Sequence, residues 1–336
     1  MELLRRFFAE SARLIGRVYA GSNAYFSQGC IVRSRDGAIT VENSSQILEN
    51  GVIVGERAHP VFVGKKTVFG HKSLLIGAQV GNLCEIGNNS ILMPGATVGD
   101  MCILGEGTLL KEGMHIPAGS VVLGRPGRII RALSRTDRDM IVRMRGNDTA
   151  LPGYRPHLLE CPAPKEDNMA TLYAYKGKFP AISDSACLFP SAEITGDVQI
   201  GDKTIIGAGV KIIGDGHGPV RIGNNVQILE NSVLHLLPDT ELRIEDHAII
   251  GPGCVIHGCQ IGSGTVIEPG AIVCDNSIIG KNSLIKAGSL VKQRSRFPDQ
   301  VVLDGFPAMI DASATPELKP SWIFCYEEAL QLLSGG

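Results

Sequence analysis

The stretch "VGNLCEIGNNSILMPGATVGDMCILGEGTLL", residues 80 to 110, carries an aliphatic residue at every sixth position, from Val80 and Ile86 to Leu104 and Leu110. Small residues such as Cys84 lie four places after these positions. A helix would repeat its apolar residues every three or four positions, and an amphipathic strand every two. A period of six with Gly-Asn and Gly-Asp corners indicates short strands joined by sharp turns, the pattern of a parallel β-helix.

The six-residue period extends beyond this stretch and returns in the second half of the chain. We expect its members to point into the core. In the first half they are Phe62, Val68, Leu74, Val80, Ile86, Leu92, Val98, Leu104, Leu110, Ile116 and Val122. In the second half they are Ile194, Ile200, Ile206, Ile222, Ile228, Ile249, Val255, Ile261, Ile267, Val273, Ile279, Ile285 and Val291. The pattern predicts an all-β protein made of hexapeptide-repeat β-helices.

A longer repeat divides the chain in two. "QILEN" at 46–50 recurs at 227–231, 181 residues later, and "GRPG" at 124–127 is followed at the same offset by "GFPA" at 305–308. We therefore expect two β-helix domains in tandem. The expected organisation is an N-terminal amphipathic helix at 1–28, a first β-helix at 29–134, a helix and linker at 135–180, a second β-helix at 181–310, and a tail with a short helix at 311–336.

Three segments outside the repeats predict helices. The first, "MELLRRFFAESARLIGRVYA" at 1–20, places apolar residues on one helical face and arginines on another. It is open to three interpretations: a matrix-targeting presequence, a helix that docks on a membrane or a partner, and a helix that packs on its own domain. The others are "GRIIRALSRTDRDMIVRMR" at 127–145 and the end of the tail.

Composition limits the classes of function. The formal net charge is −2 and no basic cluster dominates the sequence, which argues against a nucleic-acid partner. No apolar run approaches the roughly 20 residues of a membrane-spanning helix. The nine cysteines form no Cys-x-x-Cys pair, and most fall at small inward positions of the repeats. They indicate buried, reduced thiols and not a disulfide framework.

Two histidine-bearing segments stand in the same register of the two halves. "IIGPGCVIHGC" at 249–259 holds Pro252 and His257, and "VFGHKSLLIGA" at 68–78 holds His71 and Ile76 at the matching places. Each half therefore carries the histidine that the other lacks. Histidines at the corners of a β-helix are often merely solvated, so these side chains are either surface residues or parts of one divided metal site.

Both halves resemble γ-class carbonic anhydrases, over residues 29–134 and 181–310. The family forms trimers of left-handed β-helices of triangular section, with zinc at each subunit interface. Two histidine ligands come from one subunit and the third from its neighbour. Carried over by position, the resemblance implies that His235 and His257 are the pair and that His71 is the single ligand. The other positions hold Val54, Ile76 and Pro252.

A second pairing of that family is divided in the same way. An Arg and an Asp of an Arg-Gly-Asp segment pair between subunits there. Here "IVRSR" keeps Arg33 without the Asp, whereas "KIIGD" keeps Asp215 with Ile213 in place of the Arg. The resemblance therefore implies an interface between unlike units that contains Arg33 and Asp215.

The resemblance implies at most one zinc site, formed by His71, His235 and His257 and giving about one zinc ion per chain. Three imidazoles and an open position are the ligands of a catalytic zinc ion, which in this family hydrates carbon dioxide. However, the glutamine that organises the family's site corresponds to Leu229, and the following aspartate to Glu230. Because losing such supporting groups typically costs 10 to 100-fold in affinity or activity, we do not expect an active enzyme.

A ring of three β-helices needs one more than this chain supplies, so one further γ-carbonic-anhydrase-like subunit is the expected partner. The N-terminal segment also resembles that of the γ-carbonic-anhydrase-like subunits of mitochondrial respiratory complex I, which form heterotrimers. That likeness implies an assembly subunit on the matrix side of the inner membrane. Its N-terminal helix would contact subunits of the membrane complex, and no transmembrane segment is expected.

Three other functions are compatible with the sequence. The first is an active zinc carbonic anhydrase. The second is a hexapeptide acyltransferase with an acyl-coenzyme A donor, because that class shares the β-helix and the closing "GRPG" segment. The third is a β-helical adaptor in a cytoskeletal complex, which would be cytoplasmic. Zinc content, binding to coenzyme A and cell fractionation separate them.

Overall fold

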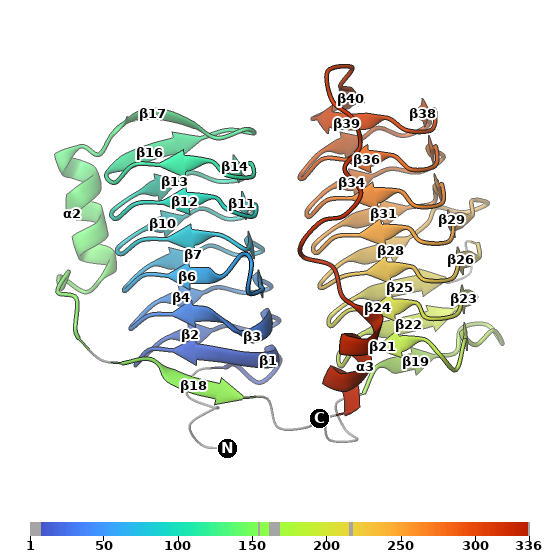
Figure 1. The fold of residues 1–336 in the computed structure, drawn as a ribbon, viewed down its shortest axis with the longest axis horizontal. Coiled ribbons are helices and arrows are strands. Elements are labelled where there is room, and N and C mark those ends of the chain that lie inside the picture. Colours follow the sequence, from blue (N-terminus) through green and yellow to red (C-terminus); the bar gives the residue numbers. More distant parts are fainter. Residues whose placement is uncertain (1–7, 154, 161–168, 215–217, 335–336) are drawn as a thin grey trace. The chain divides into compact units, whose positions relative to one another are not determined.

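The computed structural model describes residues 8–153, 155–160, 169–214 and 218–334. The chain divides into two compact units, unit 1 (Met1–Cys161) and unit 2 (Pro162–Gly336). Each is a stack of coils made of short strands, and strands that follow one another along the chain lie on different faces (Figure 1). Almost all strand pairs are parallel, so the all-β solenoid expected from the six-residue period is confirmed.

In unit 1, one sheet runs in the order β14-β11-β8-β5-β3-β6-β9-β12-β15, and a second in the order β17-β16-β13-β10-β7-β4-β2. The long strand β3 carries the first sheet around a corner, so this sheet covers two faces. The strands of the first sheet are β1 (Arg13–Ala20), β3 (Ile31–Val41), β5 (Val52–Gly55), β6 (Val61–Val63), β8 (Leu74–Ile76), β9 (Gln79–Val80), β11 (Ile91–Leu92), β12 (Thr97–Val98), β14 (Leu109–Leu110), β15 (His115–Ile116) and β18 (His157–Glu160). Those of the second are β2 (Tyr25–Phe26), β4 (Gln46–Ile47), β7 (Val68–Phe69), β10 (Glu85–Ile86), β13 (Ile103–Leu104), β16 (Ser120–Leu123) and β17 (Arg128–Ala132).

Unit 2 has three sheets, one on each face of the solenoid. We name two of them by a central strand. The β28 face holds β19 (Thr171–Tyr173), β22 (Glu193–Gly196), β25 (Lys211–Gly214), β28 (Val233–His235), β31 (Val255–His257), β34 (Ile272–Val273) and β37 (Leu290–Val291). The β26 face holds β20 (Ala181–Ile182), β23 (Val198–Ile200), β26 (Val220–Ile222), β29 (Leu242–Ile244), β32 (Gln260–Ile261), β35 (Ile278–Ile279) and β38 (Arg296–Phe297). The third sheet holds β21 (Cys187–Leu188), β24 (Ile205–Ile206), β27 (Gln227–Ile228), β30 (Ile249–Ile250), β33 (Val266–Ile267), β36 (Leu284–Ile285), β39 (Val302–Gly305) and β40 (Ala308–Ile310).

The core of each unit is a column of stacked aliphatic residues, but its register differs from the expected one in two places. Phe69 is buried in the core of unit 1, whereas Phe62, which we expected to point inward, is 37% exposed. The core positions run through Leu75 and then Val80, five residues later. Phe62, Val68 and Leu74 are therefore one residue out of register, and so are Ile249 and Val255, because unit 2 shortens the same corner.

The N-terminal helix is wrong over the described part of its range. Residues Arg13–Ala20 form β1, which pairs in parallel with β3, and Tyr25–Phe26 form β2. Residues 1–7 lie outside the described residues. Apolar side chains at Leu14, Ala20 and Phe26 continue the six-residue period into the core, and this packing overrides the helical spacing of the same segment.

The segment that we expected to be a helix and linker belongs largely to unit 1. Of its predicted first helix, 128–132 are the antiparallel strand β17, and Arg135–Met144 are the helix α2, which begins with a capping box between Ser134 and Asp137. Beyond α2, β18 pairs antiparallel with β1 and covers the open edge of the first coil.

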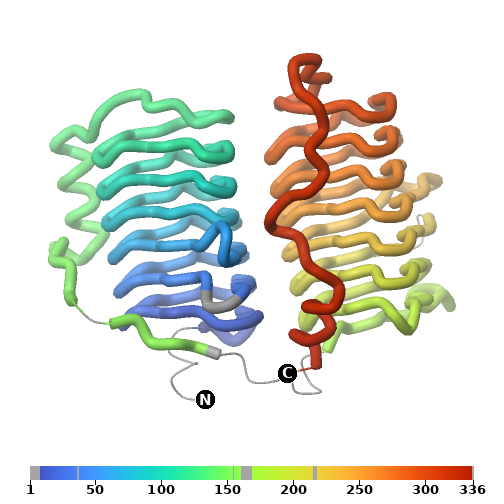
Figure 2. Tube along the Cα trace, viewed as in Figure 1, coloured from blue at the N-terminus to red at the C-terminus, as the bar shows by residue number. Residues whose placement is uncertain are grey.

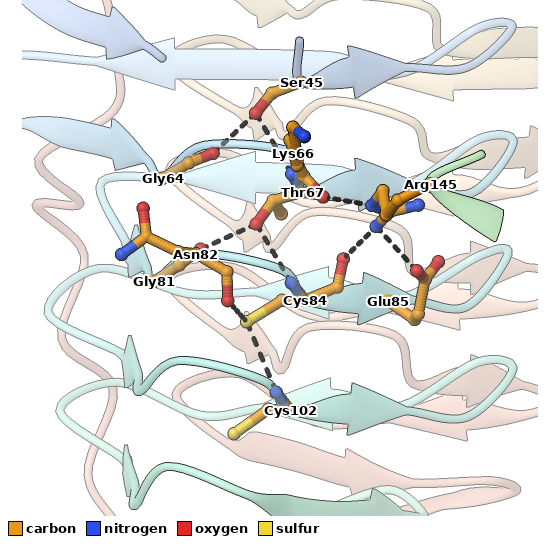
Figure 3. A network of polar contacts seen from close by, with 10 residues as sticks. All are labelled: Ser45, Gly64, Lys66, Thr67, Gly81, Asn82, Cys84, Glu85, Cys102 and Arg145. Carbon is orange, nitrogen blue, oxygen red and sulfur yellow. Dashed lines mark hydrogen bonds and ion pairs between the residues drawn. The ribbon is translucent and has the colours of Figure 1, made fainter. Parts of the chain in front are cut away.

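Arg145, which follows α2, attaches the helix to the sheet of β7 and β10 (Figure 3). Its Nη2 lies 2.6 Å from Glu85 Oε1 and donates to the Cys84 carbonyl at 3.3 Å, while Nε donates to the Lys66 carbonyl at 2.5 Å. Burial raises the pKa of Glu85 to about 7, and the neighbouring guanidinium acts in the opposite direction. A buried charged contact thus holds the helix against the coils.

Unit 2 is covered on its corresponding sheet by the C-terminal segment. Figure 2 shows the chain after β40 running back along the outside of the coils. It ends in the helix α3 (Tyr326–Ser334), which contacts β21, and Gln227 exchanges two hydrogen bonds with the backbone of Phe324 at 2.9 Å each. Among the described residues, no helix is long and apolar enough to cross a membrane.

Candidate metal centre

Unit 2 places two histidines next to each other at one corner. His235 ends β28 and His257 ends β31, and the two residues are direct partners in the parallel register. Their rings meet edge to face with 5.7 Å between centroids, and both side chains are partly exposed. The two histidines that the resemblance assigned to one side of a zinc site therefore lie side by side.

A carboxylate lies beside the second of these histidines. Asp275 follows β34, the next strand of the β28 face, and its Oδ2 is 3.6 Å from His257 Nδ1. Asp275 is almost buried, and its Oδ1 accepts the backbone N–H of Leu237 at 3.3 Å. A carboxylate beside Nδ1 favours the proton on that nitrogen and leaves Nε2 as the metal ligand.

The single histidine of unit 1 has a carboxylate partner as well. His71 follows β7, is exposed, and has its Nδ1 2.6 Å from Glu49 Oε2. The other oxygen of Glu49 accepts a hydrogen bond from the Ser27 hydroxyl at 2.7 Å. The hydroxyl of Ser27, and to a smaller degree His71, holds the pKa of Glu49 below its usual range. Ser27, Glu49 and His71 follow β2, β4 and β7, which are neighbours in one sheet.

Most of the residues at the histidine corner of one unit are replaced by other residues in the other unit. By the register of the strands, the places of His71 and Ser27 are taken in unit 2 by Pro252 and Gly207. The places of His235, His257 and Asp275 are taken in unit 1 by Val54, Ile76 and Pro94. The complementarity therefore extends from the histidines to the side chains that orient them. Glu49 is the exception, because unit 2 keeps a buried Glu230 at its place.

Neither unit completes a metal site alone. Over its described residues, each unit lacks a third His, Cys, Asp or Glu grouped with its histidines in a way that could hold a metal ion. The residues present nevertheless suit zinc, because imidazole nitrogens are common zinc ligands and a carboxylate at Nδ1 is the usual support of such a ligand. The described residues of each unit therefore supply only part of the ligand set that the resemblance implies.

Sequence reasoning missed Glu49, Ser27 and Asp275. Their signal is the spacing of the coils: Glu49 and His71 are 22 residues apart, as are Ser27 and Glu49, while Asp275 follows His257 by 18. Residues one coil apart stack at the same corner.

The thiols of Cys254 and Cys259 are fully buried in the core, and burial raises the pKa of both, so they match the prediction of buried, reduced thiols.

Arg33, the first residue of the expected interface pair, lies on β3 in register with Val54 and is buried. Val54 occupies the place of His235, so Arg33 lies one coil from the position of a zinc ligand. Asp215 lies outside the described residues, and its pairing with Arg33 stays a prediction.

The faces that border the histidine corners are apolar on their outer side. In unit 1 the outward ladder of β5, β8, β11 and β14 is Val52, Leu74, Ile91 and Leu109. In unit 2 the matching ladder of β28, β31, β34 and β37 is Val233, Val255, Ile272 and Leu290. Their neighbours along each strand belong to the core, so alternation directs these side chains away from it. The side chains of the unit 1 ladder are buried, at most 5% exposed, whereas those of the unit 2 ladder are half-buried.

Comparison with known proteins places the repeats in a family. The model described as "Bacterial transferase hexapeptide (six repeats)" matches residues 258–293. The model described as "Hexapeptide repeat of succinyl-transferase" matches residues 60–94, 78–112 and 241–274. Together with the parallel coils, these matches show that both units contain hexapeptide repeats and are solenoids of the left-handed type.

Curated relatives include a carbonic anhydrase and an uncharacterized transferase. A carbonic anhydrase from Geobacillus kaustophilus is 41% identical over 102 residues, which are 29% of this chain and 56% of that protein. The uncharacterized transferase YtoA from Bacillus subtilis is 43% identical over 90 residues, 27% of this chain and 52% of that protein. The chain spans about half the length of the curated relatives it matches.

Solved structures of similar fold include two bacterial proteins. One is a putative acetyltransferase from Bacillus cereus, 32% identical, with a TM-score of 0.42 over 48% of this chain and 88% of that one. The other is a hexapeptide transferase family protein from Anaplasma phagocytophilum, 27% identical, with a TM-score of 0.39 over 48% of this chain and 90% of that one.

Proposed function

We propose that this chain is an assembly subunit of a ring of three γ-carbonic-anhydrase-like β-helices and that it holds one zinc ion between unlike units. His71 of one unit and His235 with His257 of another would be the ligands. The observation that carries the proposal is the complementary distribution of ligands and orienting side chains between the units. Independent loss of an ancestral site in each unit would not be expected to spare opposite halves of it.

The outer faces support the ring. Each unit carries an apolar ladder outside its core on the face that borders its histidines, and a third β-helix with a similar face would bury the half-exposed ladder of unit 2. Arg33 and Asp215 would pair across the same interface. Because two units come from this chain, one further subunit of the same class completes the ring.

Zinc bound by three imidazoles is a Lewis acid able to activate water. Asp275 and Glu49 would keep the Nδ1 protons of His257 and His71 in place and direct Nε2 to the ion. However, Leu229 is fully buried and apolar at the place where the family carries a glutamine, so it offers no donor to the site. The similarity to a carbonic anhydrase therefore supports a zinc-binding scaffold with little or no hydration of carbon dioxide.

Attachment to mitochondrial respiratory complex I, on the matrix side of the inner membrane, is the location we propose for this ring. Part of this expectation came from a predicted N-terminal docking helix, but Arg13–Ala20 form a strand. The proposed location therefore depends on the family resemblance. Cell fractionation tests it directly: recovery with cytoplasmic proteins would contradict it.

The ring is tested by replacing Ile272, in the apolar ladder of the β28 face, with glutamate. A charge there would prevent burial against another β-helix, so the variant should no longer co-purify with a partner subunit from its native source, as measured by native mass spectrometry. Gln260→Glu on the β26 face is the matched control and should leave the complex intact. A wild-type chain recovered alone or as a homotrimer would contradict the proposed ring.

An acyltransferase is the second candidate, favoured by the family model that is described for transferases and matches residues 258–293. It predicts retention on a coenzyme A resin and elution by free coenzyme A. Zinc-independent retention that survives loss of His71 and His257 would favour this function over the zinc scaffold.

A further inference from the structure

A groove on the β26 face of unit 2 is separate from the histidine corner. It has a volume of about 610 Å³ and opens over β26 and β29, and Arg221, Arg243 and Lys281 are among the residues that line it. Arg221 and Arg243 are direct partners in the parallel register. Their backbones are therefore about 4.8 Å apart, and both side chains leave the same face.

Arg221 is held in position from one side. Its Nη1 contacts Asp197 Oδ1 at 2.8 Å and donates to the Val220 carbonyl at 3.0 Å, and Lys178 contacts the same aspartate at 2.5 Å. The pKa of Asp197 is lowered by Lys178 and by Arg221, which keeps the carboxylate charged. The guanidinium has two further donor atoms, Nε and Nη2, in a fixed plane.

Arg243 is held more loosely. Its Nη2 contacts Glu241 Oε1 at 2.7 Å, but the arginine side chain is 50% exposed and the glutamate 34%. An exposed pair of this kind contributes little and exchanges readily for a ligand of higher charge. One arginine is therefore pre-positioned and its neighbour is adjustable.

Two carboxylates also line the groove, and both already accept backbone hydrogen bonds. Glu245 accepts the N–H of Ser263 at 3.0 Å, and Asp246 accepts the N–H of Asn224 at 2.7 Å. These contacts tie both carboxylates to the corner of the coils and offset part of their charge. The two arginines and Lys281 remain as the donors for an anion.

The β-helix itself does not require these cations. At the places of Arg221, Arg243 and Lys281, unit 1 carries Thr40, Phe62 and Asp100 in the same fold. The cations are thus a feature of unit 2 alone. A planar guanidinium pair with a nearby ammonium group is the arrangement that binds phosphate oxygens most effectively.

We propose that this groove binds the phosphate group of a small molecule, such as a nucleotide or a sugar phosphate. Arg221 and Arg243 bind the phosphate oxygens, and Lys281 contacts the ligand from the neighbouring corner. The groove shares no lining residue with the histidine corner and lies on the β26 face, whereas the proposed ring uses the β28 face.

Isothermal titration calorimetry of the full chain with inorganic phosphate and with pyrophosphate tests the site. Both should bind saturably, and Arg243→Gln should weaken binding by about tenfold or more, as expected for the loss of a charge-assisted hydrogen bond. Arg296→Gln, on β38 of the same face but outside the groove, is the matched control and should bind as the wild type does. Thermal unfolding confirms that each variant is folded.

Vesicles that contain a phosphoinositide form the last arm of the experiment, because a lipid headgroup offers the same chemistry. Stronger binding of pyrophosphate or a nucleotide than of vesicles supports a small-molecule site. Absence of saturable phosphate binding, equal losses in Arg243→Gln and Arg296→Gln, or binding to vesicles alone would overturn the proposal.

Discussion

At the scale of single residues, the decisive feature is that two of the three candidate ligands, one in each unit, have a carboxylate beside Nδ1 on a neighbouring coil. Glu49 contacts His71 at 2.6 Å and Asp275 lies 3.6 Å from His257. A histidine that is merely solvated needs no such support. The two pairs lie on unlike units and at different corners, so a shared requirement for an oriented imidazole explains both of them.

Glu49→Ala is the prediction that follows for the zinc site. It removes the carboxylate that lies beside His71 Nδ1, so zinc affinity in the assembled protein should fall by about 10 to 100-fold. A competition titration with a chromophoric zinc chelator measures the change. Glu112→Ala, at an exposed corner of the same unit, should leave the affinity as it is. Equal affinities in the two variants would mean that Glu49 does not support a metal ligand.

The sequence could predict the three histidines but not their supporting residues. His71, His235 and His257 follow from the resemblance, because its motif is local in sequence. Glu49 and Asp275 are one coil away from their histidines, at 22 and 18 residues, and the coil length differs between corners. Without the register of the coils, the sequence does not show which carboxylate stacks on which ring.

At the scale of elements, the register of the coils, which the sequence does not show, also explains why some core positions were predicted one residue out of place. A period of six cannot reveal a corner that is shortened by one residue, because adjacent positions in these strands are both apolar. Val68 precedes Phe69, and Leu74 precedes Leu75, so both registers fit the pattern. At the N-terminus, Leu14 and Val18 fit a helical face and an alternating strand equally well. Only the continuation through Ala20 and Phe26 separates the two.

The corrected register predicts a clear difference between two phenylalanines. Phe69 is 1% exposed and Phe62 is 37% exposed. Phe69→Ala should lower the free energy of unfolding by about 3 to 5 kcal/mol, because it leaves a cavity in the core. Phe62→Ala should cost less than about 1 kcal/mol. Urea unfolding of the two variants measures both values, and a larger loss for Phe62→Ala would restore the register read from the sequence.

The attachment of α2 predicts a pH-dependent effect. In the wild type, Glu85 has a folded-state pKa of about 7, above its ordinary value of about 4.3. The free energy of unfolding therefore falls as the pH rises toward 7 and the buried Glu85 ionises. The guanidinium of Arg145 limits this fall because it stabilises the charged carboxylate. Arg145→Ala should lower the free energy of unfolding by about 3 kcal/mol at pH 8, where the buried carboxylate would stand without its cation.

The same variant should cost less at pH 5.5, where Glu85 is protonated and needs no cation. Arg143→Ala, an exposed position in the last turn of α2, is the control and should cost little at either pH. Thermal or urea unfolding at the two pH values gives the comparison. A destabilisation that is the same at pH 5.5 and pH 8 would show that Arg145 acts through its other contacts alone.

At the scale of the whole molecule, the repeat determines the fold, and the proposed function depends on the differences between the repeats. The 181-residue duplication could be read from the sequence because identical motifs mark it. The role could not, because the two units share a fold while their side chains at the histidine corners and on the β26 face differ. The described residues of each unit hold only part of the proposed ligand set, so the proposed zinc site needs ligands from both kinds of unit.

Zinc content of the complex isolated from its native source, with its partner still bound, tests this account most directly. We predict about one zinc ion per chain by elemental analysis, lost in His71→Ala and equally in His257→Ala, while His115→Ala, at an exposed position, retains it. Loss in both variants would show that ligands from unlike units meet at one ion. An absence of zinc from the intact complex, or zinc that survives His71→Ala, would contradict the divided site.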